Sequence, residues 1–103
     1  MKLKKLMKEV EKVNDCLYNY FVSVELKKVE AFTPQLYVLS NNKDMFSVYF
    51  LGVKIADIIE YNTDEYDTFL GNVLGNMNVL LDSFGSPMVE YNCNSDEYYI
   101  QED

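Results

Sequence analysis

The chain has 103 residues, of which 49% are hydrophobic, and a formal net charge of −8. This length and composition fit one folded domain spanning residues 1–103, and they exclude two domains or a disordered chain. The sequence has no His and all nine of its basic residues are Lys, which excludes imidazole as a base or metal ligand and guanidinium as a phosphate clamp.

Two features of the sequence concern where the protein acts. No apolar run approaches the roughly 20 residues that a membrane-spanning helix needs. The N-terminus is basic, but charges interrupt it too often for the apolar centre of a signal peptide. We therefore expect a cytoplasmic protein, in which Cys16 and Cys93 are reduced thiols.

Charge is distributed unevenly along the chain. Every Lys lies at or before Lys54, so residues 1–54 carry a formal charge of +3. Residues 55–103 contain eleven acids and no base. A surface of negative charge attracts basic partners and repels nucleic acid and anionic lipid. This pattern predicts a partner protein with a basic surface, and no direct binding of nucleic acid or membrane.

The N-terminal segment has the periodicity of an amphipathic helix. Apolar residues recur at helical spacing from Leu3 to Leu17, which predicts a helix over residues 2–18. The lysines and the acids Glu9 and Glu11 are expected on the opposite face. A basic helix of this kind can lie on an anionic membrane, but the acidic remainder of the chain favours a helix that covers a sheet.

The middle of the chain predicts four strands. Alternation of apolar and polar residues predicts strands at 20–30 and 35–40, separated by a break at Pro34. Residues 46–61 predict a hairpin, because Leu51 and Gly52 suit a tight turn between two alternating runs. Four sequential strands with short links predict an antiparallel four-stranded meander.

Residues 62–84 predict a second helix. Asn62 and Glu65 form a capping-box pattern at its start, and Gly85 suits its end. Gly71 and Gly75 lie four residues apart inside it, although each costs a helix about 1 kcal/mol relative to Ala. These two glycines receive the first helix, or are merely tolerated, or form a smooth surface on which a partner docks.

The C-terminal segment predicts a closing β-hairpin over residues 88–101. Its two arms are rich in Tyr and other strand formers, and a polar loop at 92–96 joins them. The hairpin either joins the sheet or stands apart from it. The complete prediction is an α+β fold, in which two helices flank the meander.

The sequence offers little for catalysis or metal binding. Its serines and cysteines have no His to activate them, and its acids lie mostly on loops and helix ends, which disfavours a paired-carboxylate hydrolase. Asn92, Asn94 and Asp96 resemble the start of a calcium loop, but Glu97 stands where that loop needs Gly. We therefore interpret this segment as a turn, and we expect no enzyme activity, no metal and no cofactor.

Acids and tyrosines together form the remaining candidate site. Carboxylates can stand in for a row of phosphates, and tyrosines supply rigid contact area that suits interfaces. An alternative interpretation is a solvated acidic face that only keeps the protein soluble. The residues predicted to bind a partner are Asp57, Glu60, Tyr61, Asp64, Glu65, Asp67, Gly71, Gly75, Asp96, Glu97 and Tyr98.

The C-terminal segment and the order of elements also resemble a known group of proteins. The segment LLDSFGSPMVEYNCNSDEYYIQ, at 80–101, runs from a helix through a Ser-Pro step into a tyrosine-bearing strand. It resembles small acidic phage and mobile-element proteins of Gram-positive bacteria, and the chain is similar to anti-CRISPR proteins in size and acidity. The resemblance implies a protein that acts in the cytoplasm of the host bacterial cell and occupies the basic groove in which a CRISPR effector holds DNA or RNA.

Three functional classes follow from these observations. The first is a phage-encoded inhibitor that binds a CRISPR effector nuclease through an acidic, Tyr-rich surface and blocks its nucleic acid. The second is an immunity protein or antitoxin that neutralises a basic toxin. The third is a structural protein that forms homo-oligomers through the stripe at Gly71 and Gly75. The sequence leaves a monomer and a homodimer open.

Overall fold

The structure is a computed structural model that describes residues 3–24, 34–42, 45–59 and 68–101. It confirms an α+β fold in which both sheets are antiparallel. In chain order the described elements are α1 (Leu3–Val24), β1 (Leu36–Asn42), β2 (Met45–Phe50), β3 (Val53–Ile59), η1 (Thr68–Leu74), α3 (Gly75–Ser83), β4 (Val89–Asn92) and β5 (Glu97–Ile100).

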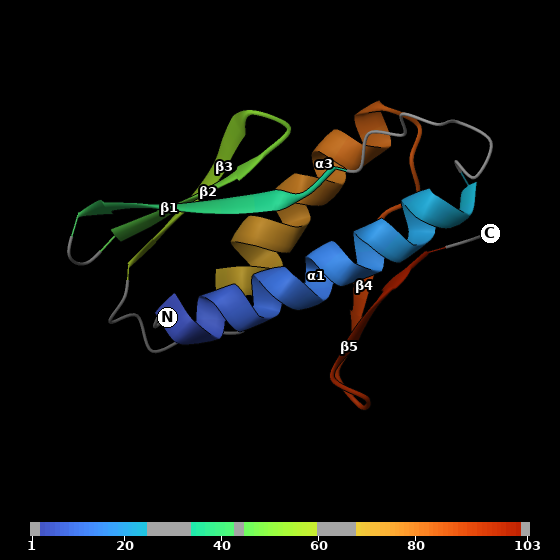
Figure 1. Cartoon of the computed structure of the whole chain (residues 1–103), viewed down its shortest axis with the longest axis horizontal. Helices are drawn as coiled ribbons and strands as arrows, with labels where there is room; N and C mark the ends of the chain where they lie inside the picture. The colour runs from blue at the N-terminus through green and yellow to red at the C-terminus, as the bar shows by residue number, and fades with distance from the viewer. Residues whose placement is uncertain (1–2, 25–33, 43–44, 60–67, 102–103) are drawn as a thin grey trace.

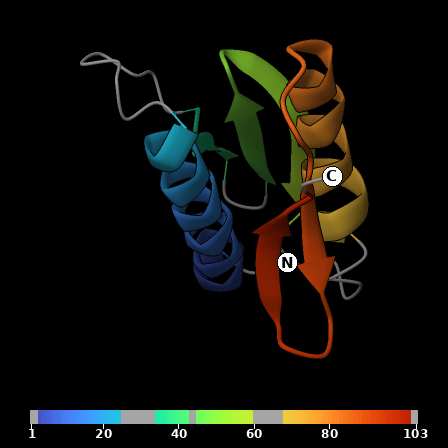
Figure 2. The same cartoon turned by 90° about the vertical axis from the view of Figure 1, so that its right-hand side faces the viewer.

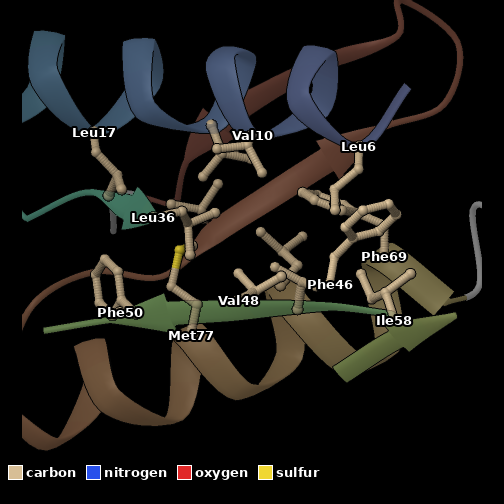
Figure 3. Packing of buried hydrophobic residues seen from close by; sticks show 14 of the residues in the cluster. Leu6, Val10, Leu17, Leu36, Phe46, Val48, Phe50, Ile58, Phe69 and Met77 are labelled. Atoms are coloured by element: carbon tan, nitrogen blue, oxygen red, sulfur yellow. The ribbon is translucent and has the colours of Figure 1, made fainter. Parts of the chain in front are cut away.

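Two helices and two sheets enclose a single core. Figures 1 and 2 show α1 on one side of the molecule and η1 with α3 on the other, while the sheet β1–β2–β3 and the hairpin β4–β5 lie between them at opposite ends. Leu6 and Leu17 point from α1 toward Phe46 and Phe50 of β2, and Met77 reaches the same space from α3 (Figure 3). All five of these side chains are buried.

Helix α1 continues through residues that were predicted to form a strand. The predicted strand at 20–30 is wrong at 20–24, because these residues belong to α1; residues 25–30 lie outside the described residues. The apolar spacing from Leu17 to Phe21 also fits a helix, and in the helix Phe21 packs against the core. Packing therefore overrides the strand propensity of this segment.

Among the described residues the larger sheet has three strands in the order β1–β2–β3, and the predicted first strand of the meander is not part of it. The predicted hairpin turn is confirmed: Leu51 and Gly52 have φ of 54° and 78°, the signs of a type I′ turn. The register shifts between Val48 and Tyr49, which leaves Ile55 of β3 as an extra residue in a bulge.

The second helix is confirmed from Thr68 onward, and its predicted start at Asn62 lies outside the described residues. Its first part, η1, is π-helical, and it becomes α-helical at Gly75. Its end has a Schellman motif: the Gly85 N–H donates to the Asp82 carbonyl at 2.9 Å, and the Ser86 N–H donates to the Leu81 carbonyl at 3.0 Å. Gly85 has a φ of 75°, as its predicted role requires.

The closing hairpin is confirmed and stands apart from the larger sheet. Val89 lies opposite Ile100 at one end of the hairpin, and Asn92 lies opposite Glu97 at the other. In the connecting loop the Asn94 N–H donates to Asn92 Oδ1 at 2.9 Å, which is the turn that we expected here in place of a calcium loop.

Asparagines on the helices bind backbone groups of the strands. Asn14 of α1 both accepts from the Leu36 N–H, at 2.7 Å, and donates to the Leu36 carbonyl, at 3.1 Å. Asn78 of α3 does the same to Val89, at 2.9 and 2.8 Å. A third asparagine, Asn76, donates to the carbonyl of the bulged Ile55 at 2.6 Å. These bonds fix the position of each helix against a particular strand.

Candidate protein-interaction surface

Part of the predicted acidic site lies within the described residues. Asp57 is on β3, Asp96, Glu97 and Tyr98 are on the closing hairpin, and Gly71 and Gly75 are on the second helix. The structure therefore divides the predicted site between a sheet, a hairpin and a helix. The other predicted residues, Glu60, Tyr61, Asp64, Glu65 and Asp67, lie outside the described residues.

The carboxylate of Asp57 is paired within its own sheet. It accepts a hydrogen bond of 2.6 Å from the Ser47 hydroxyl and one of 3.1 Å from Lys54 Nζ. The Ser47 hydroxyl, and next the Lys54 ammonium, hold the pKa of Asp57 below its ordinary value. Asp57 is therefore ionised, but much of its charge is balanced locally.

Asp96 is likewise paired, and one of its two partners ties the hairpin to α1. The Tyr91 hydroxyl donates to Asp96 at 2.6 Å, and Lys12 Nζ of α1 donates to it at 3.1 Å. The Tyr91 hydroxyl, followed by the Lys12 ammonium, lowers the pKa of Asp96. In return, the hydrogen bond to Asp96 is the main cause that raises the pKa of Lys12.

The side chain of Tyr98 points toward the interior of the protein rather than toward solvent. Its hydroxyl donates to Glu9 Oε1 of α1 at 2.8 Å, and its ring lies 6.1 Å from that of Phe69 and 5.0 Å from that of Tyr91. Burial, and then the bond to Glu9, raises the pKa of the Tyr98 hydroxyl well above its ordinary value of 10.0. Tyr98 thus anchors the hairpin, and its hydroxyl stays protonated.

Glu9 is the main residue that sequence reasoning misplaced. It was predicted on the polar face of the first helix, but only 3% of it is exposed. Its position between Leu6 and Val13 was the available signal, because residues three and four apart share one helix face. Its carboxylate is held by the Tyr98 hydroxyl and lies 3.5 Å from Lys12 Nζ, as a buried charge requires.

Glu97 differs from Asp57 and Asp96, because its carboxylate is not paired with any described residue. It is exposed, and no described residue forms an ion pair or hydrogen bond with it. It borders an open groove of about 390 Å³ between the hairpin and α1, together with Lys12, Cys16 and Tyr98. Burial raises the pKa of the Cys16 thiol, so this groove presents a protonated thiol and not a nucleophile.

The two helix glycines do not contact the first helix. A Cβ atom built on Gly71 meets nothing within 4 Å, and one built on Gly75 meets only the Leu70 carbonyl of its own helix, at 3.7 Å. The interpretation that these glycines receive the first helix is therefore wrong. The tolerated glycine and the docking surface both remain predictions.

In the described ranges, no three His, Cys, Asp or Glu side chains lie close enough together to hold a metal ion. No helix within the same ranges has the length and hydrophobicity to cross a bilayer.

We compared the chain with models of known protein families, with curated proteins and with solved structures. None of these comparisons finds a match.

Proposed function

We propose that this protein is a non-enzymatic inhibitor that binds a basic surface of a host defence nuclease. The specific target that we propose is the nucleic-acid groove of a CRISPR effector, which the resemblance to anti-CRISPR proteins suggests. The observation that supports this proposal is the one-sided charge of the second half of the chain. The carboxylates described after Lys54 are Asp57, Asp82, Glu90, Asp96 and Glu97, and the sequence after Lys54 contains no basic residue.

The acidic residues of this surface differ in role, because some are paired within the protein and Glu97 is not. Asp96 and Tyr98 hold the hairpin against α1 through Lys12 and Glu9. Glu97, which lies between them in sequence, is left to meet a basic partner. Asp96 and Tyr98 fix the hairpin on either side of Glu97, so binding through Glu97 costs little conformational entropy of the hairpin.

The test measures target-DNA binding by a purified CRISPR effector loaded with its guide RNA, with and without this protein. We expect the wild-type protein to reduce DNA binding, and Glu97→Lys to bind the effector about threefold to tenfold more weakly, because it replaces an attraction by a repulsion. Asp82→Lys is the matched control: it makes the same change of charge at an exposed position on α3 and should leave inhibition unchanged.

Salt provides a second readout in the same assay. Binding driven by charge weakens as salt rises from about 0.05 M to about 0.5 M, because the Debye length shortens. An affinity that does not change over this range would contradict phosphate mimicry. Failure to bind any CRISPR effector, with capture of a basic toxin from a host lysate instead, would replace the inhibitor by an immunity protein or antitoxin.

A further inference from the structure

The outer edge of β1 has backbone groups that are open to a partner. In an antiparallel pair, alternate residues direct both their N–H and their C=O away from the neighbouring strand. Leu36 is such a residue, since both of its groups bond to Asn14 and not to β2. Val38 lies two residues further along β1 and has the same orientation, and no described residue outside the sheet bonds to its backbone.

A groove runs beside this edge, between β1 and α1. It has a volume of about 430 Å³, and its walls include Met7 of α1 and Tyr37 and Val38 of β1. Met7 is 44% exposed and Tyr37 is 60% exposed, so apolar surface is available on both walls. The groove thus offers hydrogen bonds on one side and apolar contacts along its length, which is what an extended peptide uses when it adds to a sheet edge.

The charges in the groove indicate the chemistry of the occupant. Glu11 and Asp15 line its helical wall, and they stand four residues apart on one helix face, where like charges repel. Both are exposed, and within the described part of the chain neither forms an ion pair. A basic side chain would relieve this repulsion. A second copy of the protein would instead bring its own Glu11 and Asp15 to the same seam, which disfavours self-pairing.

We propose that the edge of β1 at Val38, with the groove beside α1, binds an extended segment of a partner protein in which apolar and basic residues alternate. The segment adds as a fourth strand next to β1. Its backbone bonds to Val38, its apolar side chains contact Met7 and Tyr37, and its cations face Glu11 and Asp15. This site belongs to the first half of the chain and does not depend on the proposed nuclease target.

The probe for this site is an acetylated hexapeptide that alternates Lys and Val. We expect it to slow hydrogen exchange of the Val38 amide, measured by NMR, because that amide becomes a donor to the added strand. Two control peptides separate the contributions: one alternates Glu and Val, and the other keeps the lysines but has N-methylated valines, which cannot pair as a strand. Neither should protect Val38.

Variants of the protein complete the experiment. The double variant Glu11→Lys/Asp15→Lys should bind the Lys–Val peptide about tenfold more weakly, while Asp82→Lys, on the distant helix α3, should not. Equal binding of the N-methylated peptide would show attraction by charge alone and would overturn strand addition. A Val38 amide that is already protected in a dimer of the free protein would assign the edge to a second copy and would also overturn the proposal.

Discussion

At the scale of single residues, the most informative group is the buried carboxylate of Glu9. It is held by the hydroxyl of Tyr98 on the hairpin and lies near Lys12 on its own helix. Lys12 also bonds to Asp96, so one network connects α1 to the residue before β5 and to Tyr98 near the start of that strand. A carboxylate buried in this way is tolerated only while its hydrogen bonds are complete.

The Tyr98→Phe variant tests this connection. It removes the hydroxyl but keeps the ring, so Glu9 loses a hydrogen bond while packing is preserved. We expect the free energy of unfolding to fall by about 1–3 kcal/mol, the usual cost of an unsatisfied buried polar group. The measurement is urea denaturation followed by circular dichroism.

Tyr99→Phe is the matched control for that experiment. The Tyr99 hydroxyl donates to Glu90 at 2.7 Å, but this pair is exposed on the hairpin, so its loss should change stability by no more than about 0.5 kcal/mol. Equal effects of the two variants would mean that Glu9 does not depend on Tyr98.

Sequence reasoning identified Tyr98 but not its role. The Tyr-rich hairpin suggested contact area for a partner, whereas Tyr98 contacts α1. The partner of Tyr98 could not be predicted, because Glu9 is 89 residues away in sequence and only the fold brings the two together. Asp57 and Asp96 were predicted as open carboxylates for the same reason: the donors Ser47 and Lys12 appear beside them only after the chain folds.

At the scale of elements, local signals predicted the turns and the end of the second helix, and long-range packing decided the rest. Leu51 with Gly52, and Gly85 after the helix, have conformations that follow from their own chemistry. The extension of α1 could not be predicted in this way, because its apolar spacing near Phe21 fits both a strand and a helix. The core that Phe21 joins settles the choice.

Glycine-to-alanine substitutions test the second helix, because the change should stabilise the protein inside the helix and destabilise it at the helix end. Gly71→Ala with Gly75→Ala should raise the free energy of unfolding by up to about 1 kcal/mol per site, since Ala favours a helix and the added methyl groups meet no clash. Gly85→Ala should lower it by about 1–2 kcal/mol, because its φ of 75° strains a residue with a side chain.

The same double variant bears on the docking interpretation of Gly71 and Gly75. If a partner backbone approaches these glycines, the double variant should be more stable and yet fail to inhibit the target nuclease. Thermal unfolding and the DNA-binding assay measure the two properties separately. A more stable protein with full activity would exclude docking at this stripe and leave the acidic surface as the candidate.

At the scale of the whole molecule, stability should depend on pH through its internal ion pairs. The pKa values of Asp57 and Asp96 are below their ordinary value of 3.8 in the folded protein. A carboxyl group of this kind contributes stability that is fully present above its unfolded pKa and is lost as pH falls through its folded pKa. The melting temperature should therefore decrease as the pH is lowered past about 4.

The stability that Lys12 contributes depends on pH in the opposite direction. Its pKa is raised above the ordinary value of 10.5, so its contribution is complete below that pH and is lost as pH rises further.

The double variant Asp57→Asn/Asp96→Asn should melt at a lower temperature at pH 7 and should lose less stability on acidification than the wild type. Asp82→Asn, an exposed control, should follow the wild-type curve; an identical slope for the double variant would contradict this assignment.

The three helix asparagines that bind strand backbones have a consequence for the behaviour of the protein at high concentration. Asn14, Asn76 and Asn78 occupy backbone groups of β1, β3 and β4 that could otherwise pair with strands of another molecule, the first step of cross-β aggregation. Net charge also keeps molecules apart, but that protection disappears near the isoelectric point. Amide side chains carry no charge, so we expect these strand positions to stay closed to fibril growth under acidic conditions as well.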